Sequence, residues 1–363
     1  MAAAEVTVMG GGIFGLSIAF ACACRGARVH LIERHRVGAG SSGGVVGALA
    51  PHTPENWNAK KQFQLDSLLM AEGFWADVAR LSGIDPGYAR LGRLQPLPDE
   101  RAIAQARRRA EEAGTLWQGQ AFWRVEAGTD DWRGTSPTGL WVFDSLSARL
   151  HPRRAATALV AAIRALGGTV TEQGQPRETG HPPDLATNDF PDATPTGPVI
   201  WATGHAGLLA LSSDLGQALG GGVKGQAALL ACAAASQPQL FVDGLHIVPH
   251  FDGTVAIGST SEREWVDPSG TDDQLDTLIA RARAACPLLA SAPVTDRWAG
   301  IRPRAASRAP ILGRWPGRQG HFIANGGFKI GFGMAPKVAD VMADLVINGH
   351  ADIPDGFGLK EPL

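Results

Sequence analysis

The first 33 residues have the pattern of a βαβ unit, in which a glycine-rich turn joins a strand to a helix. A β-branched run leads into Gly10, Gly12 and Gly15, which have the spacing G-x-G-x-x-G. An apolar helix follows, and a second β-branched run ends in Glu33. Since two parallel strands need a crossover helix between them, this pattern predicts an α/β fold built on a parallel sheet.

The glycines of this turn predict a binding site for the pyrophosphate of a dinucleotide. Gly10 permits a tight turn, Gly12 lets the backbone approach the pyrophosphate, and Gly15 lets the helix pack closely on the strand. The backbone amides at the helix start, at Ile13 and Phe14, lie at the positive end of the helix dipole. We therefore expect a bound dinucleotide at this turn.

Glu33 stands at the end of the second strand, where a carboxylate can accept hydrogen bonds from both hydroxyls of an adenosine ribose. Its negative charge would repel the 2'-phosphate of NADP, so the sequence disfavours that cofactor. The neighbouring Arg34 is a further candidate for contact with the cofactor.

The charge balance and the cysteines exclude several classes of partner. The chain has 33 basic and 35 acidic residues and a net charge of -2, so no basic excess favours nucleic acid. The uncharged run from Val6 to Cys24 is nearly long enough to span a bilayer, but four glycines interrupt it, and we expect no membrane span. The four cysteines suggest neither a disulfide framework nor a metal site, so we expect no metal and a cytoplasmic location.

Three later segments are also rich in glycine and small residues. Residues 38–51 read GAGSSGGVVGALAP, residues 199–204 read VIWATG, and residues 298–303 read WAGIRP. Together with the N-terminal turn, they resemble the FAD-dependent oxidoreductases of the D-amino-acid oxidase family, and within it the glycine oxidase branch. The resemblance implies FAD as the cofactor, with further contacts from Ser41, Ser42, Gly47, Ala48, Leu49, Thr203 and Gly204.

The order of these segments predicts two interleaved domains. The first is a Rossmann-type, glutathione-reductase-like FAD-binding domain, and the second is an α+β substrate domain built on an antiparallel sheet. The FAD-binding domain is expected at 1–82, 141–212 and 298–363, and the substrate domain at 83–140 and 213–297.

A hairpin is the strongest signal in the second domain. Asp252-Gly253 separates two apolar runs, at 245–251 and 254–258. By the strand period of two, His246 and His250 share a face that meets either substrate or solvent, and His246 is the candidate for a role in the site. The Pro- and Gly-rich region at 174–198 predicts an irregular loop.

Arg302 and Lys329 are the predicted substrate-binding cations. In the family the arginine that matches Arg302 holds the substrate carboxylate, a role that suits its planar fork. Lys329 belongs to a G-F-K triplet with Gly327 and Phe328, similar to the triplet of the sarcosine oxidase branch, whose lysine also contacts the carboxylate. Packing of the Lys329 stem over the flavin is the alternative. Ile330 completes the predicted cofactor contacts.

The resemblance implies oxidation of a small amino acid or secondary amine, of the glycine, sarcosine or D-amino acid type, by hydride transfer to flavin N5. The imine product would hydrolyse to a keto acid, and molecular oxygen or another electron acceptor would reoxidise the flavin. A helix predicted to begin at Pro336 would direct its first amides toward the flavin. The FAD is expected to be non-covalently bound, because residues 305–325 contain no cysteine.

Several alternatives stay open. An NAD-dependent dehydrogenase shares the turn, but the single tyrosine, Tyr88, has Gly92 where the short-chain class needs lysine. A dehydrogenase that uses a quinone or protein acceptor would have the same flavin site. A tRNA methylaminomethyl-demodifying oxidase and a non-catalytic nucleotide-binding module are the others. The sequence leaves open which amine is oxidised and whether the chain forms a homo-oligomer.

Overall fold

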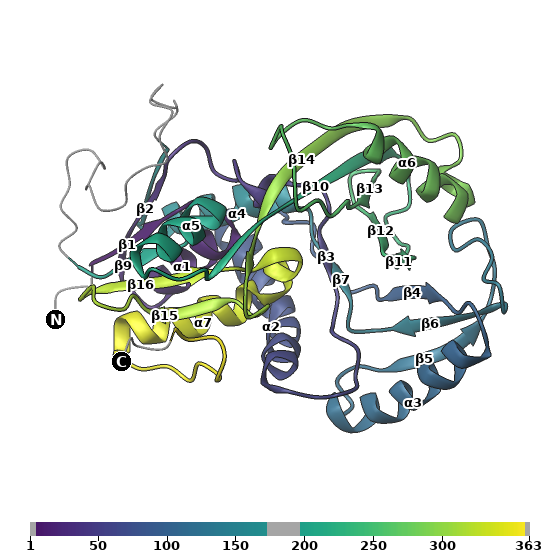
Figure 1. Cartoon of the computed structure of the whole chain (residues 1–363), viewed down its shortest axis with the longest axis horizontal. Helices are drawn as coiled ribbons and strands as arrows, with labels where there is room; N and C mark the ends of the chain where they lie inside the picture. The colour runs from purple at the N-terminus through teal and green to yellow at the C-terminus, as the bar shows by residue number, and fades with distance from the viewer. Residues whose placement is uncertain (1–4, 173–196, 360–363) are drawn as a thin grey trace.

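Two large sheets lie side by side in the computed structural model, which describes residues 5–172 and 197–359 (Figure 1). The long strands β10 (Gly220–Ala231) and β14 (Val294–Ala305) belong to the larger sheet and extend toward the smaller one. One sheet is mainly parallel and the other mainly antiparallel, which confirms the predicted fold class. The loop predicted at 174–198 falls almost entirely outside the described residues.

The smaller sheet is parallel except at one edge. Its order is β15-β16-β9-β1-β2-β8, and β15 runs antiparallel to β16. The pairing of Val6 with Val29 and of Thr7 with Val199 places β1 at its centre and confirms the βαβ unit. Its strands are β1 (Glu5–Met9), β2 (Arg28–Glu33), β8 (Thr169–Glu172), β9 (Val199–Trp201), β15 (Ile311–Arg314) and β16 (His321–Asn325).

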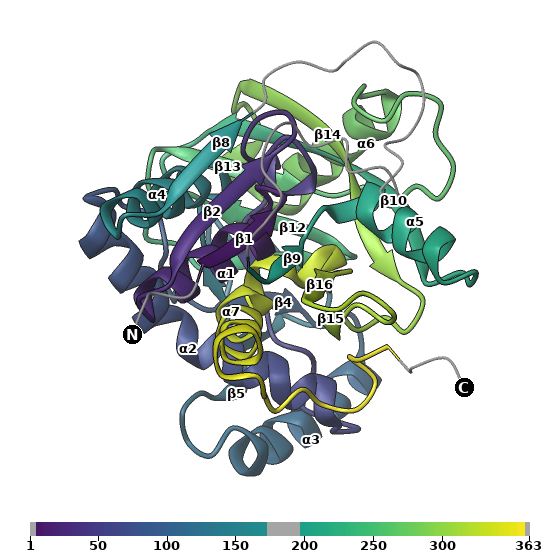
Figure 2. The same cartoon turned by 90° about the vertical axis from the view of Figure 1, so that its left-hand side faces the viewer.

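Helices cover both faces of the smaller sheet (Figure 2). Four of them pack against one another on one side, while α5 (Gly204–Asp214) lies on the other. Ile200 therefore packs into the four-helix side, and its neighbours Val199 and Trp201 pack toward α5. None of the helices in the described ranges is long and apolar enough to cross a bilayer. The four helices are α1 (Ile13–Cys24), α2 (Ala59–Ser82), α4 (Pro152–Ala165) and α7 (Gly331–Asn348).

The larger sheet has the order β14-β10-β13-β12-β11-β4-β6-β5, and its one parallel pair is β11 with β4. The predicted hairpin is present between β12 and β13, and Gly253 in its turn has a φ of 82°. The remaining strands of this sheet are β4 (Arg93–Pro96), β5 (Trp123–Ala127), β6 (Leu140–Asp144), β11 (Gln239–Val242), β12 (Leu245–Pro249) and β13 (Thr254–Gly258).

The two faces of the larger sheet carry different side chains, because successive strand residues point in opposite directions. Leu240 and Ile247 pack in one core with α6 (Asp273–Ala285). Phe241 and His246, the residues next to them, line a cavity on the opposite face. The helix α3 (Glu100–Leu116) packs on β5 at the far edge.

Two of the predicted domain boundaries fall inside strands or pairings of the larger sheet, although the division into domains itself stays a prediction. Residues from 141 were assigned to the FAD-binding domain, but β6 pairs with β4 and β5 in the larger sheet. The expected boundary at 298 falls within β14, which pairs with β10 along its whole length. The short elements are η1 (Ser41–Gly43), β3 (Ala48–Leu49), β7 (Ala148–Arg149), η2 (Pro287–Leu289) and η3 (Phe328–Ile330).

The predicted start of the last helix is wrong. Proline is favoured at the first position of a helix, which pointed to Pro336. In the structure α7 begins at Gly331, directly after η3, and Pro336 lies inside it. The first amides of α7 are therefore those of residues 331–334, next to the G-F-K triplet. The helix ends at Asn348, and Gly349 after it has a left-handed φ of 80°.

Candidate active site

A cavity of about 430 Å³ lies between the glycine turn and the larger sheet. Its walls come from the turn before α1, from residues 41–52, from the face of the larger sheet, and from residues 324–333. A volume of this size is typical of a small-molecule site. Among the described residues that line it, none is Asp or Glu, whereas Arg93, Arg302 and Lys329 are basic.

Most of the predicted site residues line this cavity. Those that do not are Gly10, Gly15, Glu33, Arg34, Gly47, Leu49 and Thr203. The predicted residues that line it are Gly12, Ile13, Phe14, Ser41, Ser42, Ala48, Gly204, His246, Arg302, Gly327, Phe328, Lys329 and Ile330.

The glycines of the turn have distinct steric roles. Gly10 has a φ of 108°, and an added Cβ would lie 2.5 Å from the carbonyl oxygen of Ala202. A Cβ on Gly15 would lie 1.9 Å from the carbonyl oxygen of Gly10. A Cβ on Gly12, by contrast, would meet only the Oγ of Ser42, at 3.3 Å. Gly10 and Gly15 are thus required by the fold, while Gly12 keeps the cavity floor open.

Glu33 ties the turn to the end of β2. Its Oε2 accepts a hydrogen bond from the Gly11 amide at 2.6 Å, and its Oε1 accepts one from the His35 amide at 2.9 Å. Arg34 beside it is exposed. Contact of Glu33 with an adenosine ribose, and of Arg34 with the cofactor, stays a prediction.

Three predicted cofactor residues do not line the cavity but pack next to residues that do. The carbonyl oxygen of Gly47 accepts a hydrogen bond from Leu150, and an added Cβ would overlap the Leu150 carbonyl oxygen. Leu49 is fully buried in the core. Thr203 precedes α5, and its hydroxyl is enclosed without a partner among the described residues.

Phe328 and Lys329 of the G-F-K triplet lie in η3, which Gly327 precedes, and positive charge is concentrated around the Phe328 ring. Phe328 has a left-handed φ of 45°. The Arg302 and Arg304 guanidinium carbons lie 5.7 and 5.6 Å from its ring centroid, and the Lys329 Nζ lies at 5.8 Å. Burial, and then the charge of Arg302, lower the pKa of Lys329. An anion bound beside Phe328 would relieve this repulsion.

Arg302 is 8% exposed and is held by neutral acceptors. Its Nη1 donates to Ser259 Oγ at 2.6 Å, and its Nη2 donates to the carbonyl oxygens of Lys224 at 3.1 Å and Thr260 at 2.7 Å. Burial lowers its pKa to about 10, and the charge of Glu262 opposes that shift, so the side chain stays charged at neutral pH. One Nη1 hydrogen remains for a ligand, together with the hydroxyl hydrogen of Ser259.

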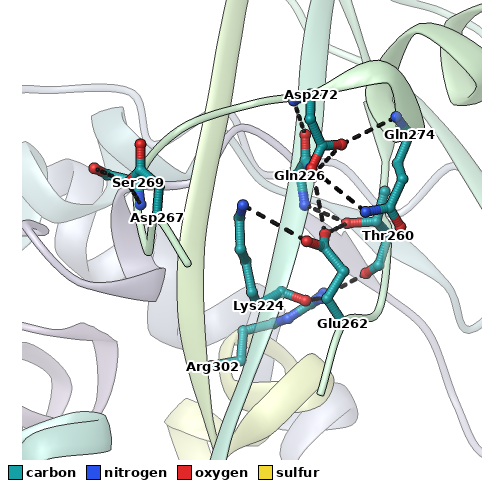
Figure 3. A network of polar contacts seen from close by, with 9 residues as sticks. All are labelled: Lys224, Gln226, Thr260, Glu262, Asp267, Ser269, Asp272, Gln274 and Arg302. Carbon is teal, nitrogen blue, oxygen red and sulfur yellow. Dashed lines mark hydrogen bonds and ion pairs between the residues drawn. The ribbon is translucent and has the colours of Figure 1, made fainter. Parts of the chain in front are cut away.

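A polar network on the opposite side of β10 fixes the residues that hold Arg302 (Figure 3). The Lys224 Nζ lies 3.6 Å from a carboxylate oxygen of Glu262. The Gln226 amide group donates to Glu262 at 3.1 Å and to Asp272 at 2.8 Å, and its backbone amide donates to the Thr260 hydroxyl at 2.8 Å. The segment after β13, which carries Ser259, is thereby attached to β10.

His246 lies on the cavity wall in its neutral form. Burial, followed by the charges of Arg93 and Lys329, lowers its pKa to about 3. Neither ring nitrogen has a partner among the described residues, and Nδ1 is enclosed. His246 can therefore exchange hydrogen bonds with a ligand but carries no charge at neutral pH.

Sequence reasoning missed several polar residues of the wall, namely Arg93, Ser259, His52, Gln64 and Asn325. Arg93 is the first residue of β4 and precedes the buried Leu94. A charged residue at the start of a buried strand was the one signal in the sequence that pointed to it. Ser259 directly follows β13, and no local pattern marks it. Both reach the cavity only through strand pairings that join distant parts of the chain.

His250 supports the cavity wall, and its burial predicts that the free energy of unfolding falls in acid. It is fully buried, and its Nε2 lies 3.0 Å from the carbonyl oxygen of Val45, a lining residue. Burial lowers its pKa to about 4 from an ordinary value of 6.5. Between these two values the unfolded chain binds a proton that the folded chain does not, so stability falls as the pH falls.

We expect His250→Gln, which keeps a donor for Val45, to reduce this acid sensitivity. The drop in unfolding free energy between pH 7 and pH 5 should become smaller by about 2 kcal/mol, the contribution of one histidine over that range. Urea unfolding at the two pH values measures it. An unchanged drop in the variant would show that His250 is not the group responsible.

Comparisons with known proteins agree over nearly the whole chain. A family model described as DAO, FAD dependent oxidoreductase, matches residues 5–345. A glycine oxidase from Pseudomonas putida is 28% identical over 365 residues, which cover 94% of this chain and 94% of the relative.

Solved structures share the fold. The crystal structure of glycine oxidase from Geobacillus kaustophilus has a TM-score of 0.79 and 22% identity, and covers 99% of this chain and 100% of that chain. The crystal structure of L-proline dehydrogenase from P. horikoshii has a TM-score of 0.78 and 19% identity, and covers 98% of this chain and 97% of that chain.

Proposed function

Since the chain belongs to the DAO family of FAD-dependent oxidoreductases and acts on amino acids or amines, we propose that its substrate is a small amino acid or secondary amine. Glycine, sarcosine and D-amino acids are the candidate substrates. The observation that carries the proposal is Arg302, a buried arginine on the wall of a cavity that no carboxylate of residues 5–172 or 197–359 lines.

The residues of the cavity fit FAD. The open floor at Gly12, beside the start of α1, suits a pyrophosphate, because the helix dipole favours negative charge there. Gly327 packs closely on α1, since a Cβ added to it would lie 2.8 Å from Phe14. Residues from the turn, from η1 and from η3 would hold the cofactor, and the first amides of α7 lie at the same cavity.

Arg302 and Ser259 would orient the substrate through its α-carboxylate. Arg302 offers one free Nη1 hydrogen and its charge, and the Ser259 hydroxyl can donate a second hydrogen bond. Lys329 would add a second charge, either to the carboxylate or beside the flavin. Such a grip fixes the direction of the α C–H bond, which is how a positioned substrate gains rate.

The cavity also favours the reactive form of the amine. Arg302 and Lys329 disfavour an ammonium group nearby, so they lower the pKa of the substrate amine and favour its neutral form. When bound, FAD would supply the two-electron acceptor for this oxidation: it would take the hydride of the α C–H bond, and the lone pair of the neutral amine would form the C=N bond of the imine. Water then hydrolyses the imine to a keto acid and ammonia or an amine. No side-chain base is needed for this sequence.

An oxygen electrode tests the substrate and the acceptor together. The purified flavoprotein should consume oxygen with at least one of glycine, sarcosine or a D-amino acid, and should form peroxide and keto acid in equal amounts. Reduction of a quinone-like dye without oxygen uptake would instead support the dehydrogenase alternative. No substrate-dependent reduction of either acceptor would contradict the proposed function.

We further predict that the FAD is not covalently attached. None of the four cysteines lines the cavity, and burial raises the pKa of Cys286 to about 12. His321 does not line it either, and its Nδ1 accepts a hydrogen bond from Trp201 at 2.9 Å. Acid precipitation should leave all yellow colour in the supernatant. A flavin mass on the denatured polypeptide would refute this prediction, and a digest would identify the attachment residue.

A further inference from the structure

Arg93 is a buried arginine with only part of its guanidinium group bonded. It is 6% exposed, and its Nε donates to Asp144 Oδ2 at 3.0 Å. Asp144 is fully buried and also accepts from the Ser147 amide at 2.8 Å, so it is held in place. The two Nη groups of Arg93 have no acceptor among the described residues, although the side chain lines the cavity. Such donors normally have a partner.

The neighbours of Arg93 hold its fork at the cavity. Its guanidinium carbon lies 5.4 Å from the centroid of the Phe241 ring, and the rings of Phe241 and His246 lie 4.6 Å apart. The three residues stand on the adjacent strands β4, β11 and β12 and line the same cavity. Arg93 is therefore a buried, packed residue of the cavity wall and not a solvent-exposed surface residue.

Arg93 and Arg302 lie at two ends of the same sheet face. The Arg302 guanidinium lies over Gly225 of β10 and bonds to Ser259 after β13, while Arg93 leans over Phe241 of β11. With strands about 4.8 Å apart, the two guanidinium groups are separated by roughly 10–15 Å. After two hydrogen bonds of about 2.8 Å each, the remaining length suits a molecule with an acidic group at each end.

The charges of the cavity point the same way. Asp144 balances Arg93, but Arg302 and Lys329 have no carboxylate within ion-pair distance in the described part of the chain. One bound carboxylate would leave one positive charge, and a second would neutralise the pair. The free end of the Arg93 fork can bind that second carboxylate through two parallel N–H···O bonds.

We propose that the substrate carries two carboxylates, with the α-carboxylate at Arg302 and the second one at the Nη groups of Arg93. The substrate class is thus an acidic amino acid or an N-carboxyalkyl amino acid. This proposal rests on the proposed function for the oxidation step, but the binding of a dicarboxylate by Arg93 does not depend on it.

A titration of the flavin absorbance spectrum tests the binding without turnover. The probes are malonate, succinate, glutarate and adipate, each compared with the monocarboxylate of equal chain length. For wild type we expect at least one diacid to bind about tenfold more tightly than its monocarboxylate, the effect of one added charge-assisted grip. In Arg93→Met, which keeps the stem over Phe241, this ratio should fall to about one.

Two further variants keep the test interpretable. Arg90→Met is the matched control, because Arg90 bonds to the carbonyl oxygens of Ser145 and Gln120 and does not line the cavity. It should keep the wild-type ratio. If Arg93→Met fails to fold around the unpaired Asp144, the double variant with Asp144→Asn removes that charge. A wild type that binds diacids no more tightly than monoacids would overturn the proposal, as would an Arg93→Met protein that keeps the ratio.

Turnover separates this proposal from the proposed function. Iminodiacetate, D-aspartate and D-glutamate should include the substrate with the highest kcat/KM, ahead of glycine, sarcosine and D-alanine. A protein that oxidises the monocarboxylic amines and gains nothing from a second carboxylate overturns the two-carboxylate proposal alone. A protein that discriminates diacids through Arg93, yet is reduced by no amine, supports the Arg93 site and overturns the proposed oxidation.

Discussion

Gly12→Val will yield a folded but colourless protein. Gly12 has a φ of -81° and a ψ of 176°, which any residue can adopt, and a Cβ there meets only Ser42 Oγ, at 3.3 Å. The valine side chain would instead occupy the space that a pyrophosphate needs. We expect FAD affinity to fall by more than about a hundredfold, since steric overlap of this kind costs about 3 kcal/mol. Absorbance of the purified protein and circular dichroism measure cofactor and fold separately.

Gly15→Val is the matched control within the same turn. Its Cβ would lie 1.9 Å from the carbonyl oxygen of Gly10, so this variant should lose the fold together with the cofactor. The pair distinguishes a glycine that serves the ligand from one that serves the packing of α1 on β1. A yellow Gly12→Val protein with normal FAD content would contradict the assignment of the turn to the pyrophosphate.

Arg302→Met should raise the KM for the substrate at least about tenfold while FAD stays bound, because a lost charge-assisted bond costs more than about 1.4 kcal/mol. Methionine fills most of the space, and the carbonyl oxygens of Lys224 and Thr260 lose a donor. Steady-state kinetics and the flavin spectrum measure the two effects.

Arg304→Met is the control for Arg302, because Arg304 also lies over Phe328 but does not line the main cavity. Its KM should stay within about threefold of wild type, as expected for a change of surface charge. Unchanged kinetics in Arg302→Met would remove Arg302 from the substrate site. An equal loss in both variants would assign the effect to the charge around Phe328 and not to a carboxylate grip.

The sequence predicts the parts of the molecule that depend on neighbouring residues. The G-x-G-x-x-G turn and the Asp252-Gly253 hairpin each follow from backbone conformations that few residue types permit. Arg302 and Lys329, which the family resemblance assigns to the site, both line the cavity. Their contact with a substrate stays a prediction.

What the sequence could not predict depends on contacts between distant segments. Arg93 reaches the cavity because β4 pairs with β11, which joins residue 93 to residue 239. Gly47 packs on Leu150 and so shapes the wall without lining it. The start of α7 was misplaced because a proline preference is weaker than the continuous turn from η3 into the helix. In the first two cases tertiary packing decided a position that local preference left open, and in the third one local preference outweighed another.

Anaerobic reduction of the bound flavin by an amine tests the central claim most directly. The purified protein, free of oxygen, is mixed in turn with glycine, sarcosine, D-alanine, iminodiacetate, D-aspartate and D-glutamate while the flavin absorbance band is followed. The account predicts that at least one amine bleaches the band completely, with one keto acid formed per flavin, and that Arg302→Met needs at least about tenfold more of that amine. A flavin that dithionite reduces, but that no amine of either the monocarboxylic or the dicarboxylic kind bleaches, would contradict it.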